Sequence, residues 1–293
     1  MNKLNLSPIV AGMWRMTEWN LAPEQRLAFI EQCIELGVTS FDHADIYGGY
    51  GVEGLFGEAL ALKPSLRDQI QLVSKCGIKL KSSRRPAHTI QHYDTSAAHI
   101  RASVENSLKE LRTDYLDLLL IHRPDPLMDF DEVANIFSTL HAEGKVKEFG
   151  VSNFSRHQFE MLHKRIALAT NQVEFSPLHL DPMWDETFDG LQDKGIQPMI
   201  WSPACRRPPV LRRRRRQRAP APEDQGNRGR TGQAVRQRGV RVDHAAAVQA
   251  RPADGHRPHR RRASRRRSHQ IPAQPHAVVR NPPRRPRPRS RLI

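Results

Sequence analysis

Cysteine and long apolar runs are both scarce in this chain of 293 residues. Its three cysteines, Cys33, Cys76 and Cys205, show neither paired nor metal-type spacing. This spacing argues against a disulfide framework and indicates a reducing, cytoplasmic compartment. No window approaches the ~20 apolar residues of a transmembrane helix, and residues 1–16 contain no long apolar stretch. We therefore expect neither a membrane span nor a signal peptide.

Residues 206–293 lack lysine and all three aromatic residue types. They hold 27 arginines, 4 acidic residues and 12 of the 22 prolines, a net charge of +23. Residues 1–205 hold 20 Lys and Arg against 27 Asp and Glu, a net charge of −7, so the overall +16 describes neither part. A segment so charged and so poor in apolar residues cannot bury enough surface to offset its chain entropy. We predict one folded domain over residues 1–205 and a disordered tail over residues 206–293.

Strand-like and helix-like segments alternate strictly along the first part. Strands are predicted at residues 9–13, 40–43, 71–76, 116–122, 148–151, 169–175 and 197–201, and helices at residues 23–36, 52–62, 96–111, 130–143, 156–165 and 185–194. Such alternation implies a parallel sheet with right-handed crossovers. The spacing fits an α/β (β/α)8 TIM-type barrel that stops one strand short. An open doubly wound sheet is disfavoured because no Gly-rich dinucleotide loop follows the first strand.

Four residues with complementary proton chemistry stand at or just past the ends of these strands. Asp42 and Tyr47 follow the second strand, Lys75 comes near the end of the third, and His122 ends the fourth. Each residue alone is more often a solvated or locally paired group. Their agreement matters because parallel barrels carry their chemistry at the carboxyl ends of the strands.

An acid, a phenol, an amine and an imidazole are the parts of a proton-donating site. Reduction of a carbonyl requires a proton, and a phenol with a free pKa near ~10 is a poor acid at neutral pH. Lys75 would lower the pKa of Tyr47, Asp42 would hold Lys75 charged, and His122 would donate a hydrogen bond to the substrate oxygen. No metal is expected, because no His/Cys cluster offers ligands. The alternative is that Asp42 and Lys75 form an ordinary ion pair at the barrel rim.

Six motifs carry a resemblance to a known family. They are residues 40–47, Val73-Ser74-Lys75, residues 118–124, Gly150-Val151-Ser152-Asn153-Phe154, Asn171-Gln172-Val173-Glu174 and Trp201-Ser202-Pro203. In this order they resemble the aldo-keto reductases, in the bacterial branch of YdhF-type oxidoreductases, over about residues 5–203. The resemblance implies a (β/α)8 barrel and NADPH-dependent reduction of a small aldehyde or ketone. It also implies a catalytic tetrad of Asp42, Tyr47, Lys75 and His122, with Tyr47 as the proton donor.

The resemblance further implies a cofactor-binding set. This set is Gly12, Met13, Ser152, Asn153, Gln172, Trp201 and Ser202. Ser152, Asn153 and Gln172 would bond the nicotinamide carboxamide of NADPH, and Trp201 would stack on the ring. Alternatives stay open, because Ser152-Asn153 taken without the other motifs is more often a helix N-cap, here before residues 156–165. Gly12 and Met13 could be a strand exit and a core filler.

The loop at residues 79–93 is basic, with Lys79, Lys81, Arg84 and Arg85. Loops after strands shape the substrate pocket of such a barrel. The loop is therefore either a solvated basic segment, which is favoured, or a clamp for an acidic substrate.

The family pattern stops after Trp201-Ser202-Pro203, and we interpret residues 206–293 as an out-of-frame translation. Arginine without lysine is what GC-rich coding yields in a wrong frame. With synonymous codons chosen freely, residues 206–210, 256–261 and 281–290 shifted by one base can encode a Gly-rich turn, an apolar strand and a family-like C-terminal helix. The barrel would then be truncated before its eighth strand, with unpaired edges on the first and seventh strands. If the tail is genuine, we expect an unstable, inactive product.

Two other classes of function stay open. Relatives on this fold act as non-catalytic, NADP-binding regulatory subunits of channels, against which an intact tetrad argues. Arginine runs such as residues 212–216 could bind nucleic acid electrostatically, but this is disfavoured because the tail has no aromatic residue for base stacking. The residues do not specify the carbonyl substrate.

Overall fold

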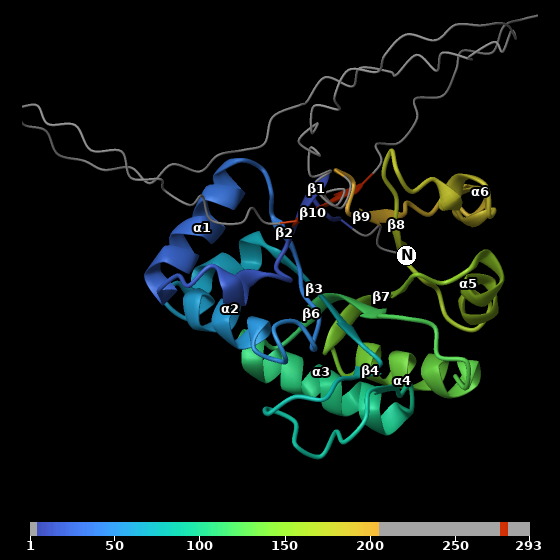
Figure 1. The fold of residues 1–293 in the computed structure, drawn as a ribbon, viewed down its shortest axis with the longest axis horizontal. Helices are drawn as coiled ribbons and strands as arrows, with labels where there is room; N and C mark the ends of the chain where they lie inside the picture. The colour runs from blue at the N-terminus through green and yellow to red at the C-terminus, as the bar shows by residue number, and fades with distance from the viewer. Residues whose placement is uncertain (1–4, 205–275, 281–293) are drawn as a thin grey trace, which may run out of the picture. The chain divides into compact units, whose positions relative to one another are not determined.

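Seven parallel strands form most of a closed barrel, and the helices lie outside it (Figure 1). The computed structural model describes residues 5–204 and the backbone of residues 276–280. The parallel strands are β1 (Ile9–Gly12), β2 (Ser40–Asp42), β3 (Gln71–Cys76), β6 (Leu116–Ile121), β7 (Val146–Ser152), β8 (Asn171–Glu174) and β9 (Met199–Trp201). Each pairs in parallel with the next in this order. The predicted barrel and its seven strands are confirmed, with every boundary within two residues.

The eighth position of the barrel is occupied, which the sequence did not predict. Between β1 and β9 lies β10 (His276–Arg280), which pairs antiparallel with both. All eight strands of a (β/α)8 barrel ordinarily run parallel, so this strand differs in direction. The prediction of unpaired edges on the first and seventh strands is therefore wrong, whereas the disorder of the tail stays a prediction. Open edges present unpaired backbone groups, and this short segment contains two valines, a residue type that favours strands.

The six predicted helices are all present. They are α1 (Pro23–Glu35), α2 (Val52–Leu60), α3 (Ala97–Leu111), α4 (Phe130–Ala142), α5 (Arg156–His163) and α6 (Thr187–Asp193). Short 3-10 turns add Met16–Glu18, Pro64–Gln69 and Asp181–Met183. Side chains cap several of the helices, because the first backbone N–H groups of a helix have no partner within it. Ser96 caps α3, Asp129 caps α4, and Ser155 forms a capping box with Gln158 at α5.

Side-chain alternation along β3 separates two buried regions. Val73 belongs to a small cluster with Val10, Leu118, Leu120 and Met199, which come from β1, β6 and β9. Leu72 and Cys76 belong to the larger core that packs against the helices. Successive side chains of a strand point to opposite faces. Lys75 therefore shares the inner face with Val73, and Ser74 shares the outer face with Leu72 and Cys76.

One structural feature of the loop after β3 was missed. A two-stranded hairpin, β4 (Ile78–Lys79) with β5 (His92–Tyr93), brackets the predicted basic loop. Its strands are only two residues long, too short for an alternation pattern to reveal.

Several other predictions can be placed on this structure. Cys33 and Cys76 are free thiols, and no helix in the described part of the chain is long and apolar enough to cross a membrane. The cytoplasmic compartment stays a prediction. Cys205, the arginine run at residues 212–216 and the three segments read as out of frame lie outside the described residues.

Candidate active site

The four predicted proton-handling residues meet at one end of the barrel. Asp42 ends β2 and Lys75 is the last inward-facing residue of β3. The Lys75 Nζ donates to Asp42 Oδ2 at 2.7 Å, to the His43 backbone oxygen at 2.7 Å and to the Tyr47 hydroxyl at 3.0 Å. Lys75 is 1% exposed and Asp42 3%, so this is a buried ion pair and not the rim pair of the alternative interpretation.

His122 completes the group from β6. Its ring meets the ring of Tyr47 edge-on, with centroids 5.9 Å apart. The His122 backbone N–H is fixed by a 2.9 Å bond to the Cys76 oxygen on the neighbouring strand β3. The structure thus brings Asp42, Tyr47, Lys75 and His122 together as predicted.

The electrostatics of the group follow from burial and from its one cation. Burial alone would lower the pKa of Lys75, but Asp42 and Tyr47 raise it, and the net shift is upward. Burial raises the pKa of Tyr47 and outweighs the lowering by Lys75. Lys75 therefore acts on Tyr47 in the predicted direction, but it does not set the net shift. Burial, with Lys75 and Arg123 nearby, holds the pKa of His122 well below its usual range, so the imidazole is neutral.

A second polar chain begins at Asp42 and runs across β8. Gln172 Nε2 donates to Asp42 Oδ1 at 3.0 Å, and Ser152 Oγ donates to the Gln172 backbone oxygen at 3.0 Å. Asn153 Nδ2 donates to Ser152 Oγ at 2.8 Å, and Trp201 Nε1 donates to Asn153 Oδ1 at 3.1 Å. Four residues at the ends of β7, β8 and β9 therefore form one network attached to Asp42.

The helix-cap alternative for Ser152-Asn153 fails. The cap of α5 is Ser155, whose hydroxyl accepts from the Gln158 backbone N–H. Asn153 instead has a left-handed backbone at φ 61°, a conformation that asparagine tolerates better than most residues. This backbone points its amide toward the network rather than toward the helix.

The remaining predicted cofactor residues lie at the ends of β1 and β9. Gly12 on β1 is the strand partner of Asp42 on β2, and the Met13 backbone N–H donates to the backbone oxygen of Asp42 at 2.9 Å. The Met13 side chain is fully buried, which fits the core-filler alternative as well as a pocket wall. Ser202 follows β9 with φ 55°.

The residues predicted to hold a nicotinamide carboxamide fit that group chemically. A carboxamide has one acceptor oxygen and two N–H donors. Ser152, Asn153 and Gln172 present hydroxyl and amide groups of both kinds, at the ends of β7 and β8, across the barrel from Asp42. The part of the chain that the structure describes shows no cluster of three or more possible metal ligands.

Trp14 lies beside the predicted tetrad but was not among the predicted site residues. Its ring is 53% exposed and lies 6.4 Å from that of Tyr47, centroid to centroid. It directly follows Met13 at the end of β1, and this strand-end position was the available signal.

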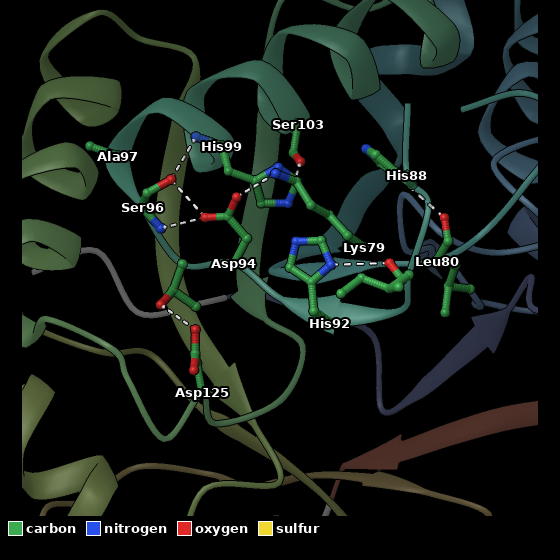
Figure 2. Close-up of polar contacts among 12 residues, drawn as sticks. Lys79, Leu80, His88, His92, Asp94, Ser96, Ala97, His99, Ser103 and Asp125 are labelled. Carbon is green, nitrogen blue, oxygen red and sulfur yellow. Dashed lines mark hydrogen bonds and ion pairs between the residues drawn. The ribbon is translucent and has the colours of Figure 1, made fainter. Parts of the chain in front are cut away.

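The basic loop is largely occupied by local contacts. Lys79 forms an ion pair with Asp94, and Figure 2 shows the two side chains meeting beside His99. Arg85 lies over the ring of Tyr50, 5.2 Å from its centroid. The Tyr50 hydroxyl in turn accepts from the Leu80 backbone N–H at 2.8 Å. Lys79 and Arg85 thus have local partners, which argues against their use as a clamp for an acidic substrate.

A layer of buried polar groups behind the tetrad was also missed. Glu53 on α2 is 3% exposed and Asp45, just after β2, is 5% exposed. Glu53 accepts from Ser74 Oγ at 2.5 Å and from Ser107 Oγ at 3.0 Å, and Asp45 accepts from Ser103 Oγ at 3.2 Å. A single acidic residue on a helix usually marks a solvated face, so the sequence carried no signal for this layer.

Comparison with known proteins relates this geometry to one family. Residues 8–250 match the profile of the Aldo/keto reductase family, which reaches past the predicted limit at residue 203. The chain is 56% identical over 202 residues to "Uncharacterized oxidoreductase YcsN" of Bacillus subtilis (strain 168), covering 68% of this chain and 67% of the relative. It is 54% identical over 198 residues to "Oxidoreductase YdhF" of Escherichia coli (strain K12), covering 67% and 66%.

A solved structure of an aldo/keto reductase is also similar to this chain. An aldo/keto reductase from Klebsiella pneumoniae, in complex with NADP and acetate, superposes with a TM-score of 0.53 at 29% identity. The match covers 64% of this chain and 62% of that one. The similarity thus spans about two thirds of the length of each of these relatives.

Proposed function

The chain belongs to the Aldo/keto reductase family, and from that premise we propose that it reduces an aldehyde or a ketone to an alcohol with NADPH. The observation that carries this proposal is the bond between Lys75 Nζ and the Tyr47 hydroxyl, with Asp42 on the other side of the ammonium. An ordinary structural ion pair needs no phenol. A proton donor that must become a phenolate does need a fixed cation beside it.

The chemistry divides between the cofactor and the protein. NADPH, when bound, supplies a hydride for the carbonyl carbon. Tyr47 gives its hydroxyl proton to the carbonyl oxygen, and the phenolate that remains is stabilised by Lys75. Asp42 keeps Lys75 charged and directed at the phenol. His122, being neutral, has one ring N–H with which to bond the substrate oxygen.

The network across β7, β8 and β9 would hold the nicotinamide. Ser152, Asn153 and Gln172 would bond its carboxamide, and Trp201, with Ser202 beside it, would line the face of the ring. Gly12 and Met13 would close the pocket from β1. The bond from Gln172 to Asp42 supports this assignment, because it ties the cofactor site to the catalytic group. The Klebsiella relative in complex with NADP supports the choice of cofactor.

The test is Tyr47→Phe in the full chain. We expect kcat/KM for NADPH-dependent reduction of a panel of small aldehydes and ketones to fall by about 10²- to 10⁴-fold, because the phenyl ring has no proton to give. The denaturation midpoint and the quenching of tryptophan fluorescence by NADPH should change little. Absence of any NADPH oxidation by the parent chain, or full turnover by the variant, would overturn the proposal.

A further inference from the structure

The outer face of β3 carries a polar residue directly beside the catalytic lysine. Ser74 precedes Lys75 in the chain, is fully buried, and points away from the barrel interior. Its hydroxyl donates to Glu53 Oε1 at 2.5 Å. Lys75 is thus held by Asp42 and Tyr47 at its side chain, and by the Glu53–Ser74 bond at the adjacent strand residue.

Glu53 is buried without an ion pair. Its two oxygens accept from Ser74 on β3 and from Ser107 on α3, and no Lys or Arg in the described residues lies within ion-pair distance of it. A buried carboxylate held by neutral hydroxyls loses much of its hydration without gaining an opposite charge. Burial, opposed by the two hydroxyls, raises the pKa of Glu53 from 4.5 to about 7.

Proton binding to Glu53 changes its hydrogen bonding. An ionised carboxylate accepts from both serines, as the geometry allows. A protonated carboxyl donates one O–H, so one serine must become the acceptor and turn its own hydrogen elsewhere. The charge behind β3 changes at the same time, from −1 to neutral.

We propose that Glu53 is a positioning residue for Lys75, acting through Ser74, and that its loss of a proton slows proton donation by Tyr47. This proposal rests on the proposed reductase function. The direction follows from charge: an ionised Glu53 opposes the formation of a second negative group, the Tyr47 phenolate. A neutral Glu53 does not, so the protonated form is the faster one.

Other ionisable groups also face Glu53. On β3 they are Lys75, which lowers the pKa of Glu53, and Cys76. Glu110 on α3 raises it, and its carboxylate lies against the backbone of Gly54, next to Glu53. Asp45 follows β2, and burial with Glu53 nearby raises its pKa well above its usual range. Glu110 therefore favours the neutral form of Glu53, and Lys75 opposes it.

The experiment compares Glu53→Gln with a matched serine pair in the full chain. Ser74→Ala and Ser107→Ala each remove one hydroxyl from Glu53, but only Ser74 adjoins Lys75. We would measure kcat at saturating NADPH and aldehyde from about pH 5 to pH 9. Independently of turnover, we would titrate the Tyr47 phenol by ultraviolet absorbance, with Tyr47→Phe as the blank.

We expect kcat of the parent chain to fall about two- to fivefold as the pH rises through about 7. Glu53→Gln should lose this step and keep the low-pH rate, and its Tyr47 phenol should titrate at lower pH. Ser74→Ala should reduce the size of the step, because it removes the link to the strand residue beside Lys75. Ser107→Ala should keep the size of the step and move it to higher pH, because it removes one hydroxyl that lowers the pKa of Glu53. An unchanged step in Glu53→Gln, or identical profiles for the two serine variants, would overturn the proposal.

The two proposals fail in different ways. If the parent chain shows no turnover but Glu53→Gln still shifts the titration of Tyr47, the reductase proposal fails and the coupling stands. If turnover is present but neither the titration nor the pH step responds, the coupling alone is wrong. Should Glu53→Gln not fold, the serine pair decides by itself.

Discussion

The two faces of β3 both bury ionisable groups, but they treat them in opposite ways. On the inner face Lys75 has Asp42 at 2.7 Å, and its pKa is raised despite burial. Behind the outer face, Glu53 is held by the hydroxyls of Ser74 and Ser107 with no ion pair among the described residues, and its pKa is raised to about 7. The ammonium is thus held charged, while the carboxyl is driven toward neutrality. Burial alone does not decide the charge of a group; the chemistry of its partners does.

This difference suits two different tasks. A cation that stays charged over the whole physiological range provides a constant field for the Tyr47 phenol. A carboxyl that titrates near neutrality makes a poor fixed charge but a natural source of pH dependence. The comparison predicts that breaking the Lys75–Asp42 ion pair has the larger effect on turnover. It also predicts that Glu53 has the larger effect on how the unfolding free energy depends on pH.

The largest effect is expected for Lys75→Met. The substitution leaves the Asp42 carboxylate buried without its cation, which costs about 3–5 kcal/mol of unfolding free energy, and it removes the charge beside Tyr47. We expect carbonyl reduction to fall about a thousandfold or more. Chemical denaturation and kcat would be measured on the same preparation.

A double variant separates the two losses. Adding Asp42→Asn to Lys75→Met removes the unpaired charge, so part of the stability should return while turnover stays as low as in Lys75→Met. If the double variant were no more stable than Lys75→Met, the buried pair would not be the source of the loss.

The second effect concerns Glu53→Gln and the pH dependence of stability. Glu53 titrates near 4.5 when unfolded and near 7 when folded, so the folded state binds more protons between these values. Its contribution to stability is fully present below about pH 4.5 and is lost as the pH rises past about 7, an amount on the order of 3 kcal/mol. The glutamine variant should lose this dependence and exceed the parent in stability above pH 7.

Unfolding free energies at about pH 5 and pH 8 would check this prediction. Asp45→Asn is a parallel case, because burial also raises the pKa of Asp45, so this variant too should lose less stability as the pH rises. Parallel stability curves for Glu53→Gln and the parent chain would show that Glu53 is ionised in the folded protein at all of these pH values.

Much of the fold, and the group of Asp42, Tyr47, Lys75 and His122 inside the barrel, could be predicted from the sequence. Strands such as 71–76 are short apolar runs between helix-like segments, and alternation of strands and helices dictates a parallel sheet. Parallel order then brings strand ends to one rim, which is why Asp42, Lys75 and His122 could be placed together from positions 33 to 80 residues apart. No side-chain contact needed to be known.

The outer layer and the eighth strand could not be predicted, because neither leaves a local pattern. Glu53 reads like any helix-surface acid until packing of α2 on α3 buries it. Gly57 records how close that packing is, since a Cβ there would lie 2.0 Å from the Glu110 backbone oxygen. The β10 backbone pairs with edges that exist only once β1 and β9 are in place. The composition of residues 206–293 as a whole is dominated by arginine and proline, so it hid the two valines of residues 276–280 that favour a strand.

A smaller effect is expected for His43→Leu. His43 is fully buried next to Phe56, and within the described residues neither of its ring nitrogens has a hydrogen-bond partner. Burial, with Lys75 nearby, lowers its pKa to about 3. Leucine is close in volume and has no polar atom to leave unsatisfied, so unfolding free energy should rise by about 1–2 kcal/mol. A loss of stability at neutral pH would mean that the imidazole has a partner.

The smallest effect is expected where an ion pair is exposed. Lys63 and Glu31 approach to 2.8 Å, close to the 2.7 Å of Lys75 and Asp42, but their side chains are 50% and 37% exposed against 1% and 4%. Water already solvates both exposed charges, so Lys63→Ala should change the unfolding free energy by less than about 0.5 kcal/mol and leave turnover unaltered. Measured beside Lys75→Met, it compares two ion pairs of nearly equal length that differ in burial and in the two further hydrogen bonds of Lys75. A loss of several kcal/mol from Lys63→Ala would contradict burial as the cause of the difference between the pairs.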